Sequence, residues 1–152
     1  CSMVKYGGTA VLSDDVRAAM AFYRDVMELE LLMDNGEHAL FKCGVAVWNR
    51  SMAQGLIFGK VSDDRAALFE LFFESDSIQA DYDRISKSAR VVNPLAEQPW
   101  GQLTFRITDP DGHLIEVGEK LSETIRRFRA QGMTDDEISA RTHTPKELLD
   151  SL

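Results

Sequence analysis

Cysteine and histidine are both scarce in this sequence. Its 152 residues include two cysteines, Cys1 and Cys43, and three histidines. Two cysteines do not make a disulfide framework, so a reducing cytoplasm is the expected location. No apolar run approaches the roughly 20 residues that a membrane-spanning helix needs, and no signal peptide is recognised, so no membrane partner is expected.

Acidic residues outnumber basic ones, with 25 Asp and Glu against 17 Lys and Arg and a net charge of −8. This balance disfavours non-specific binding to nucleic acid or anionic membranes, because both depend on positive charge. It is compatible with a cationic ligand. The apolar and charged fractions, 44% and 28%, are those of an ordinary globular protein.

The residues up to Asn49 follow the order strand, helix, strand, strand, strand. Ser13 and the two aspartates after it offer capping oxygens to the helix, whose apolar residues then recur at helical spacing. Asn35-Gly36 supplies the pair of positive φ angles that a tight hairpin turn needs. The expected strands lie at 4–12, 29–33, 37–42 and 45–49.

The same order recurs after a linker at 50–66, in which a short strand is expected at 56–58. Ile78, Tyr82 and Ile85 mark the second helix by their spacing. The expected strands lie at 67–73, 90–95, where Pro94 stops the strand, 101–108 and 113–118. A tight Asp-Pro-Asp-Gly turn joins the last two strands. An internal duplication is the economical interpretation.

A single βαβββ module has one helix and cannot cover both faces of its sheet. Two modules can pair so that each helix covers an outer face and the inner faces enclose a cavity. The sequence therefore predicts an α+β fold with modules at 3–58 and 67–119, whose curled mixed sheet surrounds a cavity. Together they form one domain, 3–119, and a helical extension follows at 120–152.

The extension is expected to hold three short helices. Leu121, Ile125 and Phe128 form an apolar stripe that should pack against the modules or against a second copy of the chain. Thr134 with Glu137 forms a capping box, and 144–147 forms another ahead of a last helix at about 145–151.

Part of the extension, 132–139, resembles the opening of a helix-turn-helix, and three arginines precede it: Arg126, Arg127 and Arg129. A DNA reader needs basic or amide side chains on its recognition helix. The segment 146–152 has one lysine against Glu147 and Asp150, so nucleic acid is not expected as a partner.

Two segments resemble the glyoxalase, bleomycin-resistance and extradiol-dioxygenase proteins, known together as the vicinal-oxygen-chelate superfamily. Residues 22–31, FYRDVMELEL, are similar to the helix-to-strand segment of its first module. Residues 99–101, PWG, followed by Phe105 and by DPDGHLIE at 109–116, are similar to the end of its second module. The resemblance covers 4–119 and implies the glyoxalase-like fold. It leaves a homodimer open.

Metal-using members of that superfamily hold a divalent ion on the first and last strands of the modules. The resemblance places Glu116 at the last-strand carboxylate ligand. The other ligand positions fall on Gly8, on Ala46 or Trp48, and on Leu68 or Glu70. Because this gives two carboxylates at best and no histidine, no cofactor is expected. The alternative is Zn, Ni, Mn or Fe held by Glu116 and Glu70.

Strand alternation divides the second module into two faces. The residues expected on the helix-covered face are Phe69, Leu71, Phe73, Leu103, Phe105, Ile107, Ile115 and Val117. The residues expected on the inner face are Leu68, Glu70, Phe72, Thr104, Arg106, Leu114 and Glu116. Glu116 and Glu70 are the candidate catalytic residues, and the candidate ligand-binding residues are Trp48, Phe72, Trp100, Thr104, Arg106 and Leu114.

Each candidate has a functional and a structural interpretation. Glu70, Arg106 and Glu116 either orient a ligand or form an internal ion-pair network in which Arg106 neutralises the carboxylates. Trp48 is a ligand platform or part of the core, and Trp100 packs over a cavity rim or anchors its loop. His113, after the turn, is interpreted as a surface histidine.

Three hypotheses follow for function. The first is a metal-poor protein that binds a small organic molecule, similar to the bleomycin-resistance branch, with a cationic planar ligand. The second is a lyase or isomerase that acts on a small carbonyl compound through Glu116 and Glu70. The third is a DNA-binding regulator whose cavity senses a metabolite. Whether the chain is an enzyme is left open, since one fold carries many functions.

Overall fold

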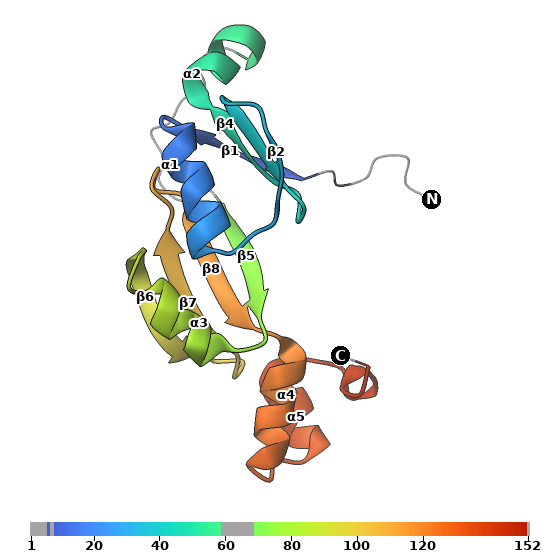
Figure 1. Cartoon of the computed structure of the whole chain (residues 1–152). Helices are drawn as coiled ribbons and strands as arrows, with labels where there is room; N and C mark the ends of the chain where they lie inside the picture. Colours follow the sequence, from blue (N-terminus) through green and yellow to red (C-terminus); the bar gives the residue numbers. More distant parts are fainter. Residues whose placement is uncertain (1–5, 7, 59–68, 152) are drawn as a thin grey trace. The chain divides into compact units, whose positions relative to one another are not determined.

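The chain folds into two four-stranded mixed sheets with helices, followed by a helical tail (Figure 1). The computed structural model describes residue 6, residues 8–58 and residues 69–151. It divides into two compact units: the described residues up to Phe69 with Asp109–His113, and Glu70–Thr108 with the described residues from Leu114 onward. The α+β class and both βαβββ modules are thereby confirmed.

The sheet of the first unit has the order β1-β4-β3-β2, with β1 parallel to β4. Its strands are β1 (Thr9–Ser13), β2 (Leu31–Asp34), β3 (His38–Phe41) and β4 (Val45–Asn49). Helix α1 (Val16–Ala21) begins where Asp15 accepts a hydrogen bond from the backbone N–H of Ala18, and it continues as the π-helix η1 (Phe22–Val26). The core between helix and sheet includes the fully buried Tyr23 and Phe41.

Two local predictions for this unit are wrong. The strand expected at 56–58 is the π-helix η2 (Gln54–Phe58), which continues α2 (Arg50–Ala53) because the Asn49 side chain caps that helix at the N–H of Met52. In the β2–β3 connection only Gly36 has a positive φ, +83°. The Asp34 carboxylate accepts from the Gly36 N–H and shapes a three-residue loop in place of the two-residue turn.

The close backbone approach expected at the glycine pair near β1 is present at Gly8. A Cβ there would lie 2.4 Å from the carbonyl oxygen of Gly44. No side chain, and so no metal ligand, fits at this position. The start of the expected first strand, at Val4 and Lys5, lies outside the described residues.

The sheet of the second unit has the order β5-β8-β7-β6, with β5 parallel to β8. Its strands are β5 (Glu70–Ser75), β6 (Arg90–Glu97), β7 (Leu103–Thr108) and β8 (Leu114–Glu119). Helix α3 (Ile78–Ile85) covers one face, where the ring of Tyr82 meets that of Phe105 and where Ile107 and Ile115 are fully buried.

Two predictions for the second sheet need correction. Pro94 does not stop β6, because β6 is an edge strand whose register shifts around that residue, so the missing N–H breaks no continuous ladder. Phe69 does not lie on the helix-covered face: it precedes β5 and is 52% exposed. Leu68 lies outside the described residues.

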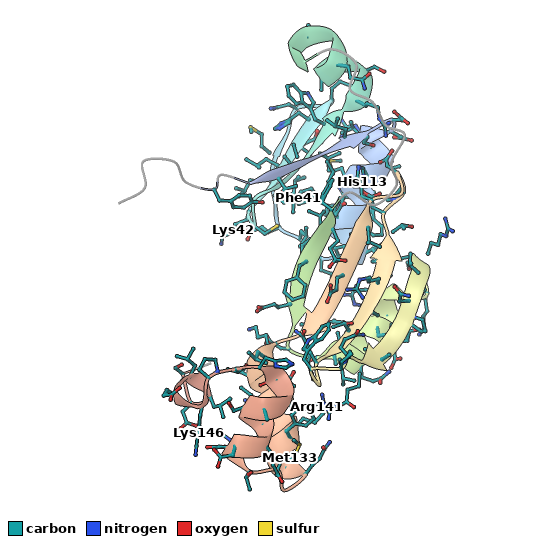
Figure 2. The ribbon with its side chains drawn as sticks, turned by 180° about the vertical axis from the view of Figure 1, so that it is seen from behind. Phe41, Lys42, His113, Met133, Arg141 and Lys146 are labelled. Carbon is teal, nitrogen blue, oxygen red and sulfur yellow. The ribbon has the colours of Figure 1, made fainter. Side chains whose placement is uncertain are left out.

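The tail consists of α4 (Leu121–Ala130), α5 (Asp135–Thr142) and the 3₁₀-helix η3 (Lys146–Leu148). Its helices share a small core of Ile125, Phe128, Ile138 and Leu149, with Leu121 and Met133 at its edge (Met133 is labelled in Figure 2). The capping box of Thr134 and Glu137 is confirmed. The second box is absent, since no side chain caps η3. Among the described helices, none is long and apolar enough to cross a bilayer.

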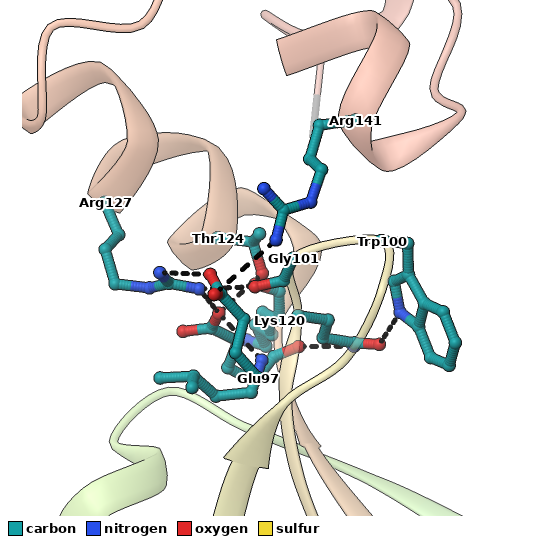
Figure 3. Close-up of polar contacts among 10 residues, drawn as sticks. Glu97, Trp100, Gly101, Lys120, Thr124, Arg127 and Arg141 are labelled. Atoms are coloured by element: carbon teal, nitrogen blue, oxygen red, sulfur yellow. Dashed lines mark hydrogen bonds and ion pairs between the residues drawn. The ribbon is translucent and has the colours of Figure 1, made fainter.

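The tail is fixed to the second sheet by an arginine clamp, Arg127 (Figure 3). Its Nη2 donates to the buried carboxylate of Glu119 at 2.7 Å and to the Gly101 carbonyl at 2.6 Å, and its Nη1 reaches Glu97 at 3.2 Å. Arg141 adds a bond from Nε to the Pro99 carbonyl at 2.9 Å. The tail therefore packs as part of the second unit.

Gly101 marks how closely the tail approaches this sheet. A Cβ on Gly101 would lie 2.3 Å from the Phe128 ring, whereas a Cβ on Gly132 would meet nothing, although both residues have a φ near +90° (+92° and +86°).

We therefore expect Gly101→Ala to lower the free energy of unfolding by about 2 kcal/mol more than Gly132→Ala. Urea denaturation of the two variants measures the difference, and equal losses would contradict the packing of Phe128 on Gly101.

Candidate functional site

Three charged side chains meet on the face of the second sheet that α3 does not cover. The central strand β8 carries Glu116, whose register partners are Arg106 on β7 and Phe72 on β5. Glu70 lies two residues before Phe72 on β5, so its side chain emerges on the same face. The inner-face positions expected for Glu70, Arg106 and Glu116 are those observed.

The guanidinium of Arg106 bridges the two carboxylates. Its Nε donates to Glu70 Oε2 at 3.0 Å, and its Nη2 donates to Glu116 Oε2 at 2.7 Å. The Glu116 side chain is 9% exposed, whereas that of Glu70 is 34% exposed. We call the two carboxylates, with the arginine that joins them, the bridged pair. It contains the ion pairs expected from the structural interpretation, and the Glu70 side is open to solvent.

The two carboxylates of the bridged pair differ in their affinity for protons. Burial, with the hydrogen bond to Glu70, raises the pKa of Glu116 to about 7, although Arg106 opposes this rise. Hydrogen bonds from Glu116 and Arg106 lower the pKa of Glu70. The pKa of Arg106 is raised by its hydrogen bond to Glu70. Below about pH 7 the proton is therefore held by Glu116, and the negative charge resides on Glu70.

Apolar groups adjoin the bridged pair on the same face. Phe72 is 49% exposed, and its Cε2 lies 3.1 Å from the Cβ position of Gly118. Leu114 is half-buried on β8. Thr104 is buried, and its hydroxyl has no hydrogen-bond partner among the described residues. This face thus combines an accessible aromatic ring with paired charges.

The two tryptophans lie in different units. Trp48 is half-buried on β4, on the face opposite the buried Val47, with its ring edge-on to His38 at 5.7 Å between centroids. Trp100 lies in the β6–β7 connection, where its Nε1 donates to Gln102 at 2.9 Å (Figure 3). That bond fits the loop-anchor interpretation of Trp100.

A second polar cluster surrounds Asp109 at the start of the turn between β7 and β8. Its Oδ2 accepts from the Tyr23 hydroxyl at 2.8 Å and lies 2.7 Å from His113 Nδ1, while its Oδ1 accepts the N–H groups of Asp111 and His113. His113, labelled in Figure 2, is thus not the surface histidine expected: its side chain is 18% exposed.

This cluster fixes the turn to the helix η1 of the first unit. Burial, with the negative charge of Asp109, raises the pKa of Tyr23. Burial also acts to raise the pKa of Asp109, but the hydrogen bonds from His113 and Tyr23 outweigh it, so the pKa of Asp109 is lowered. The sequence signal was present, since Tyr23 belongs to the FY segment and Asp109 opens the DPDG turn. Spacing alone could not show that the two segments bind each other.

Neither polar cluster suits a divalent metal. Asp109, Asp111 and His113 offer ligand atoms within 4.8 Å of one another, but both oxygens of Asp109 are already engaged in hydrogen bonds. In the bridged pair, a guanidinium binds both carboxylates, and none of the strands β5–β8 contains histidine or cysteine. Two carboxylates fall short of the roughly three protein ligands that a catalytic metal normally needs.

The arginines that suggested DNA binding are engaged within the tail and its sheet. Arg127 forms the clamp, Arg129 bridges Asp135 and Asp150, and Arg126 lies 3.2 Å from Glu123. Arginines neutralised in this way contribute less to phosphate binding. The geometry gives the regulator hypothesis no support.

Comparisons with known proteins agree with the fold. A family model described as a glyoxalase-like domain matches residues 7–122. A protein of unknown function from Agrobacterium tumefaciens is 31% identical, with a TM-score of 0.70 over 79% of this chain and 97% of that one. A lactoylglutathione lyase from the same organism is 27% identical, with a TM-score of 0.59 over 76% and 92%. The comparison with curated proteins found no match.

A glyoxalase-related enzyme from Fulvimarina pelagi is 20% identical, with a TM-score of 0.67 over 76% of this chain and 88% of that one, and is similar in fold alone. The family model ends at residue 122, near the start of α4, so nearly all of the tail lies outside its match.

The pKa of Glu116 predicts a pH-dependent stability. Because its pKa rises from 4.5 in the unfolded chain to about 7 in the folded one, its protonation stabilises the fold fully at low pH, and this contribution is lost as the pH rises towards 7. Glu70, with a lowered pKa, acts in the opposite sense below pH 4.5. We expect the melting temperature of Glu116→Gln to fall by several degrees less than that of the unmodified chain between pH 5 and pH 8. Glu74→Gln, which changes an exposed carboxylate on β5, is the control, and parallel curves for both variants would contradict the assignment.

Proposed function

Because the chain belongs to the glyoxalase-like domain family, we propose that it binds a small organic molecule on the face of the second sheet that carries the bridged pair. The observation that supports this most is the composition of that face. An exposed face of a sheet normally carries solvated polar residues, but here a buried carboxylate and a half-exposed phenylalanine stand side by side. Apolar surface with a few fixed polar groups is typical of small-molecule sites.

The groups on this face favour a planar ligand with an acceptor oxygen. Among the described residues, Nη1 of Arg106 donates no hydrogen bond, so its N–H groups are available to a carbonyl or carboxylate. Phe72 offers a ring for stacking, and Leu114, the register partner of Glu70, lies on the same face. With Glu116 protonated, the charges of Glu70 and Arg106 cancel, so the attraction for the cationic ligand expected from the overall charge is weak.

The proposal extends to the location and the assembly of the chain. Cys43 is a free, exposed thiol, which is typical of proteins in the reducing cytoplasm. A homodimer belongs to the same proposal and is tested by cross-linking. A ligand contact from Trp48 of the first unit is a separate proposal and is tested by tryptophan fluorescence on ligand addition.

Binding is predicted to depend on Phe72. We expect ligand-observed NMR to detect 4-hydroxyacetophenone, a planar neutral carbonyl compound, more strongly than benzoate or N-methylquinolinium. Phe72→Ala should weaken its affinity by about tenfold, because the stacking surface is lost. Phe69→Ala removes an equally exposed ring that lies outside β5 and should have no effect. Equal losses in both variants, or no binding of any of the three compounds, would count against this face as the site.

A second candidate function is proton transfer on a small carbonyl compound, as a lyase or isomerase. One observation favours it: Glu116, with a pKa of about 7, lies beside a carboxylate of lowered pKa. A general acid or base works best when its pKa is near the working pH, and Arg106 could stabilise an enolate oxygen. The similarity to a lactoylglutathione lyase raises the interest of this chemistry without assigning it.

Proton transfer predicts exchange at carbon. In D₂O, hydroxyacetone should lose its α-protons faster with the protein than with buffer alone, and the rate should change with an apparent pKa of about 7. Glu116→Gln should abolish the acceleration, while Glu74→Gln should keep it. A protein that binds carbonyl compounds but shows no exchange at any pH would be a binding protein only.

A further inference from the structure

We infer that Arg106 is the permanent cation of the bridged pair, held between Glu70 and Glu116 in place of a divalent metal ion. The inference goes beyond the proposed function, because it concerns which cation the two carboxylates hold and is independent of any organic ligand. It also explains the poor fit of a metal, because a side chain of the protein itself occupies the position between the two carboxylates.

The geometry makes the guanidinium and a bridging metal ion mutually exclusive. Arg106 lies 3.0 Å from Glu70 Oε2 and 2.7 Å from Glu116 Oε2, so one planar group contacts both carboxylates. A divalent ion binds carboxylate oxygens at about 2.0–2.6 Å. An ion that contacted both oxygens would therefore lie against a guanidinium whose charge has the same sign, and the repulsion is strong in a half-buried site.

A bound metal ion can dissociate from a site, but Arg106 is held in place by the chain. Arg106 and Glu116 are direct partners in the β7–β8 ladder, so the backbone itself holds them opposite each other. The Arg106 side chain is 25% exposed. Arginine guanidinium groups remain protonated in proteins. Because Glu116 is buried, its carboxylate would need another positive partner after loss of the guanidinium, and a divalent cation would then compete with a proton for that place.

A second bridge in the same chain provides a control. Arg129 also contacts two carboxylates, Asp135 at 3.1 Å and Asp150 at 2.8 Å. Those carboxylates are 42% and 85% exposed, so water can solvate them once the arginine is removed. The inference thus predicts that removal of Arg106 opens a metal site and that removal of Arg129 does not.

The test is a titration with Mn²⁺, an ion that prefers oxygen ligands, at pH 8, where Glu116 can ionise. The unbound ion is measured by electron paramagnetic resonance. We expect weak or no binding to the unmodified chain, to Arg129→Gln and to Arg106→Lys, which keeps the charge. Arg106→Gln should bind one equivalent at least about tenfold more tightly. The double variant Arg106→Gln with Glu116→Gln should lose that gain.

Two results would overturn the inference. One equivalent of tightly bound Mn²⁺ or Zn²⁺ on the unmodified chain, lost in Glu116→Gln, would show that a metal displaces the arginine. A folded Arg106→Gln, judged by circular dichroism, that binds no more ion than Arg129→Gln would show that the carboxylates are not placed for a cation. The first result requires no Arg106 variant to fold, and neither depends on the Phe72 experiment, so failure of the proposed function remains distinguishable.

Discussion

The second unit is organised around the need to neutralise buried carboxylates on its central strand. β8 carries Glu116 near its middle and Glu119 at its end, and both are buried. A buried carboxylate without a partner is costly, so an arginine must accompany each of them. Arg106 approaches from the neighbouring strand, and Arg127 approaches from the tail. The two ion pairs have different consequences: the first leaves a polar group beside an exposed ring, and the second fixes the tail.

The first unit uses the same principle at Asp109. Four hydrogen bonds satisfy its buried carboxylate, and they join the turn after β7 to the tyrosine of η1. Asp109 therefore acts as a structural fastener, although its cluster with Asp111 and His113 has the composition of a metal site. What separates the two roles is whether the oxygens are still available, and that depends on neighbours from distant parts of the chain.

Most of the fold could be predicted from the sequence because its signals are local. Alternation placed Glu70, Arg106 and Glu116 on one face, and the strand order followed from the repeated pattern. The failures have physical causes. Asn49 caps a helix where a strand was expected, and an edge strand tolerates Pro94. The partners of Tyr23 and Arg127 could not be predicted, since their bonds to Asp109, Glu97 and Gly101 join residues whose proximity depends on the completed fold.

The arginine clamp has a consequence for the cooperativity of the second unit. Arg127, the Phe128 ring and Arg141 all meet the β6–β7 connection at Gly101 and its neighbours, and the carboxylate of Glu119 is buried beneath α4. Without the helices, the carboxylate of Glu119 would lie in water, and the Phe128 ring would no longer fill the space beside Gly101. A chain cut before α4 would therefore lose the charge partner of Glu119 as well as the helices, so the sheet and the tail are expected to unfold as one cooperative unit.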